Sequence, residues 1–369
     1  MEALEPEVML RQVDSLAADL RELAVPVSRR RDALFASADW AAVGSVHLVG
    51  DGDSYYAAQA TELAFRSLAG TSCVATAALG FLEYEAPWLR LTGPGRPLVV
   101  GISSSGSTPR VVQAVTRARQ HGALTLTLTG VPGSPLTRAA DHTLPLELSR
   151  PERSPGIRTY QASLLGLLLL AVRLGEARGR HSAEETRDLD RELTSLHEGL
   201  AATVDLLGDR SRDVADVAAL VGDAPVVVMA GSGPGFGTAS FCAAKLIEGA
   251  GVFARGQDLE EWHHVERFAT PHDMPVFVIA PPGRSHWRAV EIAAKARELG
   301  RRVIAVTHRD DVEVVRHASA VLPVAARSRE EFSPLLYHPF SALLACRTAQ
   351  LLGRTPFRAG PAAAESARG

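Results

Sequence analysis

The chain has 369 residues, of which 46% are hydrophobic and 22% are charged, as in an ordinary globular protein. This length predicts two or three domains rather than one. The net charge of −3 supplies no field for holding nucleic acid, and three widely separated cysteines argue against a disulfide framework or a cysteine-based metal site. We therefore expect a reduced, cytoplasmic protein without a nucleic-acid partner.

The N-terminal segment, residues 1–37, predicts one or two lead-in helices. It begins with an acidic, amphipathic pattern, which is not that of a signal peptide. The most apolar run of the chain, Ala162–Val172, is too short to span a bilayer and predicts a buried helix. We expect no membrane partner.

A loop rich in hydroxyl groups follows a predicted strand at Leu98–Val100. The loop has hydroxyl side chains at Ser103, Ser104, Ser105 and Thr108. Capping a helix would need only one of these four. Thr108 fits the N-cap and Pro109 the first position of the next helix. Backbone N–H groups and the positive end of a helix dipole converge at such a turn, which predicts a site for a phosphate, sulfonate or carboxylate. The alternative is a capped turn that is merely rich in small residues.

An internal repeat sets the predicted architecture. Ser107–Gly122 superposes on Ser285–Gly300 at an offset of 178 residues, and each copy lies between two apolar strands. A second pair, beginning at Ser45 and at Pro225, has the order strand, glycine-rich turn and helix in both copies. A repeat this long indicates duplicated domains rather than a solenoid.

Strand and helix patterns alternate through both copies, which predicts two tandem three-layer α/β domains with mostly parallel sheets. We place the domains at residues 38–205 and 206–354, followed by a loosely ordered Pro/Gly/Ala-rich tail at 355–369. In such folds the ligand lies at the carboxyl ends of the strands, where the Gly/Ser turns occur.

Two motifs carry a resemblance to a known family. The loop has the form SxSGxT, and the later segment KLIE supplies Lys245 and Glu248, with His264 sixteen residues after Glu248. Over roughly Ser45–Leu352 the chain resembles the sugar isomerase (SIS) domain family. The likeness is to its two-domain members, namely the isomerase half of glucosamine-6-phosphate synthase, sugar-phosphate deaminases and fructosamine-6-phosphate deglycases.

The resemblance implies two flavodoxin-like αβα domains with divided roles. The first domain would grip the substrate phosphate, through Ser54 and Gly52 of the GDGDSY turn and through the loop residues Ser103, Ser104, Ser105, Gly106 and Thr108. The second domain would carry the catalytic group, and no metal or other cofactor is expected.

Three residues of the second domain receive roles from this resemblance. Glu248 would move a proton between C1 and C2 of an open-chain sugar, and partial burial suits a carboxylate to this task by raising its pKa. Lys245 would orient Glu248 or stabilise the enediolate oxygen. His264 would open the ring or shuttle the hydroxyl proton, and in the family it often reaches the neighbouring subunit, which implies a homodimer with shared active sites. A one-residue register error would exchange it with His263.

The chain departs from the family pattern in several places. We expect no glutamine-hydrolysing domain, and the tail from Gly353 has no lysine, so glutamine-dependent synthesis is not expected. Asp51 and Asp53 stand where the family has neutral residues, and carboxylates are unfavourable close to a dianion. They would then bind sugar hydroxyls or a substrate amine. The second-domain counterpart of the loop, Ala280–Arg288, has lost the serine cluster.

Other interpretations of these residues remain open. Arg153 and Arg158 could assist anion binding or lie on the surface, and a Glu three residues from a Lys is commonly a surface pair. The segment GSGPGFG misses the dinucleotide motif because Phe236 occupies the third glycine position.

The predicted function is that of a sugar-phosphate aldose–ketose isomerase or deaminase, acting on a phosphorylated sugar or aminosugar by enediol or enediolamine proton transfer. The alternatives are a fructosamine-6-phosphate-type deglycase and a non-catalytic regulator that binds a sugar phosphate.

Overall fold

The computed structural model describes residues 4–91, 93, 95–209 and 211–357. These residues form two compact units. The N-terminal unit comprises Ala18–Pro151 and Arg158–His197, and the C-terminal unit comprises Met1–Ala17, Glu152–Ile157 and Glu198–Gly369. Each unit contains one five-stranded sheet in which all strand pairings are parallel. The predicted fold class, tandem α/β units with parallel sheets, is confirmed.

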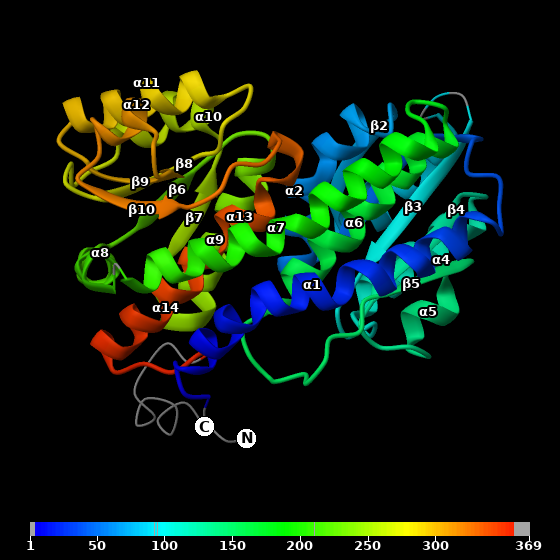
Figure 1. The fold of residues 1–369 in the computed structure, drawn as a ribbon, viewed down its shortest axis with the longest axis horizontal. Helices are drawn as coiled ribbons and strands as arrows, with labels where there is room; N and C mark the ends of the chain where they lie inside the picture. Colours follow the sequence, from blue (N-terminus) through cyan, green and yellow to red (C-terminus); the bar gives the residue numbers. More distant parts are fainter. Residues whose placement is uncertain (1–3, 92, 94, 210, 358–369) are drawn as a thin grey trace. The chain divides into compact units, whose positions relative to one another are not determined.

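The elements that begin in the first part of the chain build the N-terminal unit (Figure 1). They are α1 (Val8–Phe35), β1 (Val43–Gly50), α2 (Asp53–Ser67), β2 (Ser72–Ala77), α3 (Ala78–Gly80), η1 (Phe81–Glu85), η2 (Ala86–Leu91), β3 (Arg96–Ile102), α4 (Pro109–Gln120), β4 (Leu124–Thr129), α5 (Pro135–Ala139), β5 (His142–Pro145), α6 (Ile157–Ala177) and α7 (Ala183–Asp209). The strand order is β2-β1-β3-β4-β5, which is the flavodoxin-like order.

Helices cover both faces of this sheet because the chain reverses direction across it. Right-handed crossovers from β1 to β2 and from β3 to β4 run opposite ways, so α2 and α4 lie on opposite faces. The buried side of α4 carries Val111, Ala114, Val115 and Ala118, at helical spacing. A Cβ at Gly101 of β3 would lie 2.4 Å from Val115 Cγ2, so this glycine allows α4 to approach the sheet.

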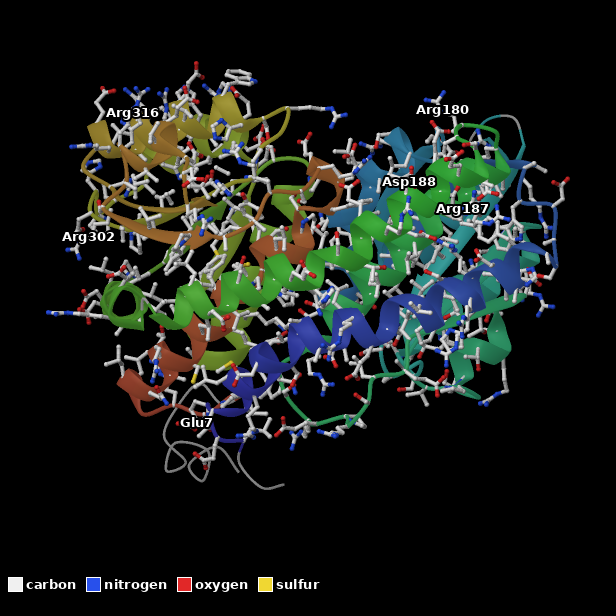
Figure 2. All side chains as sticks on the ribbon, viewed as in Figure 1. Glu7, Arg180, Arg187, Asp188, Arg302 and Arg316 are labelled. Carbon is white, nitrogen blue, oxygen red and sulfur yellow. The ribbon has the colours of Figure 1, made fainter. Side chains whose placement is uncertain are left out.

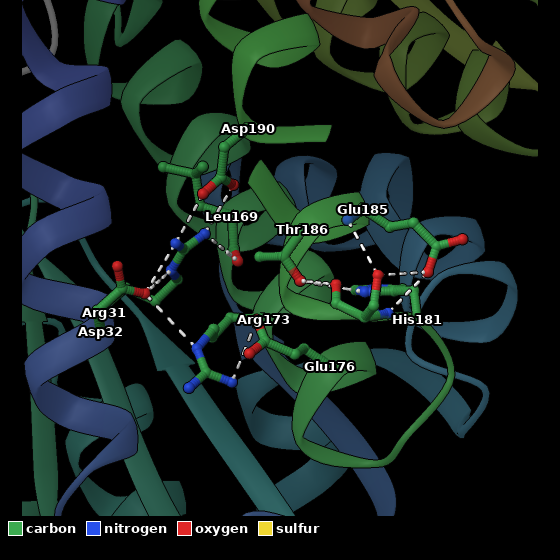
Figure 3. Close-up of polar contacts among 10 residues, drawn as sticks. Arg31, Asp32, Leu169, Arg173, Glu176, His181, Glu185, Thr186 and Asp190 are labelled. Carbon is green, nitrogen blue, oxygen red and sulfur yellow. Dashed lines mark hydrogen bonds and ion pairs between the residues drawn. The ribbon is translucent and has the colours of Figure 1, made fainter. Parts of the chain in front are cut away.

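Three helices of the N-terminal unit are joined by a buried guanidinium. Arg31 of α1 has a side chain only 1% exposed, and it contacts Asp190 of α7 at 2.8 Å and Asp32 at 2.8 Å. Its Nη1 also donates to the Leu169 carbonyl of α6 at 3.3 Å. Figure 3 shows these contacts together with Arg173, which lies 3.6 Å from Asp32. The charge is paired and hydrogen-bonded, as a buried charge must be.

Helix α6 contains the apolar run that predicts a buried helix. By length and hydropathy alone α6 is the one helix among the described residues that could cross a membrane, but 89% of its most apolar window is buried within the protein. A Cβ at Gly166 would lie 2.9 Å from Leu146 and 3.0 Å from Leu128, so α6 packs closely against the sheet. Its hydropathy is that of a core helix.

The remaining elements build the C-terminal unit, together with the start of α1 and the part of α7 from Glu198 onward. They are α8 (Ser211–Asp223), β6 (Val227–Ala230), α9 (Pro234–Ala250), β7 (Ala254–Gln257), α10 (Leu259–His264), η3 (Glu266–Phe268), β8 (Pro275–Ala280), α11 (His286–Glu298), β9 (Arg302–His308), α12 (Val312–Val315), β10 (Ala320–Val324), η4 (Glu330–Phe332), α13 (Pro334–Tyr337) and α14 (Pro339–Leu352). The strand order β10-β9-β8-β6-β7 repeats the topology of the first sheet.

Alternate residues of β8 show how this sheet is covered. Val276 and Val278 belong to the cluster beneath α10, α11 and α12, whereas Phe277 stacks on Phe340 of α14 at a ring distance of 6.0 Å. β8 is therefore apolar on both faces, as strands between two helical layers are. Arg302 and Arg316, labelled in Figure 2, are examples of charged side chains on the exposed surface of this unit.

The backbone of the glycine-rich turns reveals the duplication most directly. Gly52 before α2 has φ 54° and ψ −129°, and Gly233 before α9 has φ 55° and ψ −128°. Both torsions lie in a region that favours glycine. A second glycine lies two residues before each of these, at Gly50 and Gly231. A Cβ at either position would lie less than 3 Å from the residue four positions later in the chain. The same turn therefore starts a helix at the same point of both units.

The domain limits read from the sequence remain predictions. In the structure α1 is a single helix, and its residues before Ala18 group with the C-terminal unit. Of the tail, residues 358–369 lie outside the described part of the chain. Phe357, just before them, donates its backbone N–H to the Glu248 carbonyl at 2.6 Å.

Candidate active site

Three of the predicted loop hydroxyls gather between β3 and α4 in the N-terminal unit. Ser103 Oγ lies 2.9 Å from Thr108 Oγ1 and 3.5 Å from Ser105 Oγ. Ser103 is buried, whereas Ser105 is exposed. Thr108 is the N-cap of α4 by position, but its side chain makes no capping hydrogen bond. Its hydroxyl therefore belongs to the cluster rather than to the helix end, at the positive end of the α4 dipole.

Gly106 holds this loop in shape. It has φ +62°, and a Cβ there would lie 2.1 Å from Ser134 Oγ. Its N–H donates to the Ser103 carbonyl at 3.0 Å and its carbonyl accepts from Leu136 N–H at 3.0 Å. Glycine is required at this position for two reasons: the backbone is left-handed, and Ser134 lies too close to leave room for a Cβ.

Ser104 has different surroundings from the other three hydroxyl residues. Its carbonyl accepts from Gly130 N–H at 3.1 Å, which ties the loop to the end of β4. Ser104 also lines a cavity of about 200 Å³ together with the apolar side chains of Leu128, Leu146 and Ala162. Among the described residues its hydroxyl has no hydrogen bond to the cluster.

The GDGDSY turn lies at the same carboxyl edge of the sheet, because it follows β1, the neighbour of β3. Ser54 is half-buried in the first turn of α2. Asp51 accepts the Ala78 backbone N–H at 3.0 Å, so one carboxylate oxygen holds the turn against the start of α3. Asp53 is the first residue of α2, where a carboxylate interacts favourably with the helix dipole.

Arg158 has a structural role instead of the two roles that the sequence left open. It is buried and forms a two-bond pair with buried Asp19, at 2.5 and 2.7 Å. It also donates to the carbonyls of Ser149 and Arg150. With these donors engaged, Arg158 is available neither to an anion nor to the surface. Arg153 is exposed.

In the C-terminal unit, α9 ends in the Lys245–Glu248 pair. Lys245 is fully buried, and its Nζ lies 2.6 Å from Glu248 Oε2 and 4.9 Å from the centre of the Phe241 ring. The Glu248 side chain is 31% exposed. A buried ammonium thus anchors a carboxylate that remains accessible.

Lys295 provides a comparison within the chain. It forms the same i,i+3 pair with Glu298 at 2.8 Å, but there the side chains are 30% and 68% exposed. The surface-pair interpretation fits Lys295 and Glu298. It is wrong for Lys245, because a surface pair does not bury its lysine completely.

His338 and Cys242 surround Lys245 but were not selected from the sequence. His338, just before α14, is buried beside the Phe241 ring at 5.6 Å. Burial, with the Lys245 cation nearby, lowers the pKa of His338 to about 3. Burial raises the pKa of the Cys242 thiol to about 12. Both side chains are therefore neutral near pH 7, and only the approach of distant α14 to α9 could have pointed to them.

His264 lies at the exposed end of α10. Its Nε2 is 3.1 Å from Glu260 Oε1, and its side chain is 63% exposed. Arg288 lies 2.7 Å from the other oxygen of Glu260 and, by this hydrogen bond, lowers the pKa of that carboxyl. His263 packs edge-on against His264, with ring centres 5.8 Å apart, and burial lowers its pKa.

The structure keeps Glu248 and His264 of one chain apart. Glu248 lies at the end of α9, just before β7 begins, whereas His264 lies at the end of α10, beyond the carboxyl end of β7. Because β7 extends by about 3.3 Å per residue, the two residues lie at opposite edges of the sheet. Neither pairs with the other among the described residues.

The described residues contain no group of three or more His, Cys, Asp or Glu side chains that could hold a metal ion.

The fold and these side chains define the class of protein, a tandem α/β protein with a hydroxyl-rich βα loop in one unit and a buried Lys–Glu pair in the other. The SIS domain matches residues 41–173 and 222–349, which is most of the chain. The chain therefore belongs to the sugar isomerase (SIS) domain family, and the resemblance stated from the sequence is confirmed.

Relatives and solved structures agree with this membership. The chain is 26% identical over 291 residues to "Glutamine--fructose-6-phosphate aminotransferase [isomerizing]" of Gloeobacter violaceus, covering 79% of this chain and 46% of that protein. It thus spans about half the length of the curated relatives it matches.

Two solved structures share the fold. The C-terminal domain of glucosamine-fructose-6-phosphate aminotransferase from Francisella tularensis has a TM-score of 0.82 at 16% identity, covering 95% of this chain and 97% of that one. Glucosamine-6-phosphate deaminase from Thermotoga maritima has a TM-score of 0.70 at 17% identity, covering 95% and 96%.

Gly106→Ala tests the loop geometry. We expect it to destabilise the N-terminal unit by about 1–3 kcal/mol more than Gly133→Ala and to abolish protection by inorganic phosphate. Gly133 is the matched control because it also has positive φ, +72°, but a Cβ there meets nothing within 4 Å. Urea unfolding with and without phosphate measures both effects. Equal losses in the two variants would contradict the role given to Ser134.

His338 predicts a pH dependence of stability. The folded form resists protonation down to about pH 3, whereas the unfolded chain protonates near the ordinary pKa of 6.5. The free energy of unfolding therefore falls as pH drops through this window, by up to about 1.4 kcal/mol per pH unit.

His338→Gln removes this contribution, so we expect a flatter dependence between pH 7 and pH 4 in urea unfolding. His272→Gln, at an exposed position, is the control and should follow the wild type. Parallel curves for wild type and His338→Gln would refute the neutral, buried histidine.

Proposed function

We propose that this chain is a sugar-phosphate aldose–ketose isomerase or aminosugar-phosphate deaminase that works by enediol or enediolamine proton transfer. The observation that carries the proposal is the fully buried Lys245 holding Glu248 at 2.6 Å while the carboxylate keeps access to solvent. A general base needs such an accessible carboxylate in a fixed orientation. Family membership and the activities for which the relatives are named support the substrate class.

The hydroxyl cluster supplies the anion site in this proposal. Ser103, Ser105 and Thr108 would donate to the phosphate oxygens, aided by the start of α4. Ser54 and Gly52 would complete the contacts from the neighbouring turn. Because Ser104 lines a separate cavity and no hydrogen bond joins its hydroxyl to the cluster among the described residues, we assign it a contact through its backbone rather than through its hydroxyl.

Glu248 would perform the proton transfer. For an aldose it removes the proton from C2, the electron pair forms the C1–C2 double bond, and the O1 oxygen takes a proton. Returning the first proton to C1 while O2 loses its proton gives the ketose. Lys245 stabilises the charge that develops beside Glu248, and His264 serves ring opening or the hydroxyl proton.

The same steps release ammonia from an aminosugar. With nitrogen at C2, proton transfer from C2 to C1 produces an imine, and water hydrolyses it to the ketose and ammonia. Deglycation would run in the opposite direction. A fructosamine 6-phosphate carries its nitrogen on C1, so proton transfer from C1 to C2 with transfer of the N–H proton to O2 gives an imine at C1, and water hydrolyses it to the aldose and the free amine. Asp51 and Asp53 favour a substrate with an amine, because they place carboxylates near the phosphate loop.

Glu248→Gln tests the base. We expect it to retain substrate binding and to lower the exchange of solvent deuterium into C1 and C2 by at least about 10²-fold, because the amide cannot accept the proton. Nuclear magnetic resonance of glucosamine 6-phosphate and fructose 6-phosphate in deuterated water measures the exchange. Glu298→Gln, in the exposed pair, should exchange normally. Exchange that persists in Glu248→Gln would exclude this residue as the base.

A shared active site follows from the separation of Glu248 and His264 within one chain. If both residues act on one substrate molecule, His264 must come from a second copy of the chain. Its side chain is 63% exposed and therefore accessible to a second copy, and the exposed apolar residues Val265 and Phe268 lie close to it in the sequence. A two-fold homodimer would build two such sites.

Mixing two inactive variants tests the shared site. We expect Glu248→Gln and His264→Asn to be inactive alone, and their co-refolded mixture to regain about one quarter of wild-type activity, because half of the dimers are mixed and each has one intact site. An inactive mixture with proven subunit exchange would contradict sharing.

Binding of sugar phosphates without turnover in the wild-type chain would instead identify a sugar-phosphate-binding regulator.

A further inference from the structure

The C-terminal unit contains a cavity that the proposed reaction does not use. It measures about 400 Å³, within the range of about 300–1,000 Å³ that small-molecule sites occupy. It lies where β8, β9 and β10 end, beside the start of α11. The residues that line it include Gly283, His286, His308, Asp310, Glu313 and Arg327.

The cavity occupies the position of the hydroxyl-rich loop in the duplicated unit. The segment from Ser107 repeats as the segment from Ser285, so the connection from β8 to α11 corresponds to that from β3 to α4. In place of the serines this connection has Pro281, Pro282 and Gly283. The second unit has kept a hollow at the carboxyl edge and lost the hydroxyls that would bind a phosphate.

A buried histidine supplies a hydrogen-bond donor to this cavity. His308, at the end of β9, is 6% exposed and lines the cavity. Its Nδ1 accepts the Asp310 backbone N–H at 3.3 Å. Burial and the nearby Arg327 lower the pKa of His308, so the ring is neutral and its proton sits on Nε2. Among the described residues no partner receives that proton.

Carboxylates dominate the charge around the cavity. Asp311 is engaged, since it accepts from Thr307 at 2.5 Å, from His286 at 2.7 Å and from the backbone at the start of α12. Asp310 and Glu313 are 69% and 65% exposed, and Glu313 lies 3.9 Å from His286 Nδ1.

One guanidinium lies among these carboxylates. This guanidinium belongs to Arg327, which forms no hydrogen bond and no ion pair with the described residues. Three carboxylates against this one cation disfavour a phosphate dianion and favour an ammonium group. The histidine donor and the guanidinium suit hydroxyl groups, which accept as readily as they donate.

We propose that this cavity is a second ligand site, for an aminosugar without a phosphate group. Its amine lies against Asp310 and Glu313, and its ring hydroxyls accept from His308 Nε2 and Arg327. The site is separate from the proposed reaction, because its residues include none of the hydroxyl cluster and none of the Lys245–Glu248 pair.

Calorimetric titration of the full chain with glucosamine tests this site. We expect one glucosamine per chain, and weaker binding of glucose, which lacks the amine. Asp310→Asn combined with Glu313→Gln should weaken glucosamine binding at least about tenfold, because both charged partners of the amine are lost. Both residues are exposed, so the fold is not at risk, and Glu298→Gln on α11 is the matched control.

Two further measurements separate this site from the first one. Ser105→Ala should leave glucosamine binding unchanged, and the double variant should keep the wild-type deuterium exchange with glucosamine 6-phosphate. Equal affinity in the double variant and wild type, or loss of glucosamine binding in Ser105→Ala, would overturn the second site and leave the proposed reaction standing. No binding of glucosamine at all would also overturn it.

Discussion

The placement of the polar groups in both units depends on the parallel direction of the strands. Because neighbouring strands run the same way, every connection must cross the sheet through a helix, and every strand-to-helix turn lies at one edge. The glycine turns at Gly52 and Gly233 let a helix begin at once after the strand, with the same backbone torsions in both units. Small residues therefore collect at the edge where polar groups and helix N-termini converge.

Duplication placed two such edges in one chain, and their side chains diverged. In the N-terminal unit the edge has hydroxyl groups and a glycine that cannot be replaced without contact with Ser134. In the C-terminal unit the equivalent edge has carboxylates around a cavity, while the Lys245–Glu248 pair lies at the other end of α9. The same scaffold thus carries different charges at its two equivalent edges, and these charges are the basis of the two ligand sites proposed above.

The two lysines of the chain differ in how far their side chains are buried. Lys245 and Lys295 each precede a glutamate by three residues, and sequence spacing treats the two pairs alike. Packing of α14 on α9 covers Lys245 completely and sets neutral His338 beside it, whereas Lys295 stays on the outer face of α11. A buried ammonium must keep its carboxylate partner, so the position of Glu248 is constrained in a way that Glu298 is not.

The sequence by itself determined the parallel α/β class, the repeat, the hydroxyl loop and the Lys–Glu spacing, because each depends on residues close together in the chain. Tertiary structure decided the rest. Arg158 pairs with Asp19 across 139 residues, and Ser104 lines a cavity that distant strands and α6 build. Strand direction sets Glu248 and His264 at opposite edges of one sheet. Local pattern does not encode such contacts, because they arise only when separate helices and strands pack together.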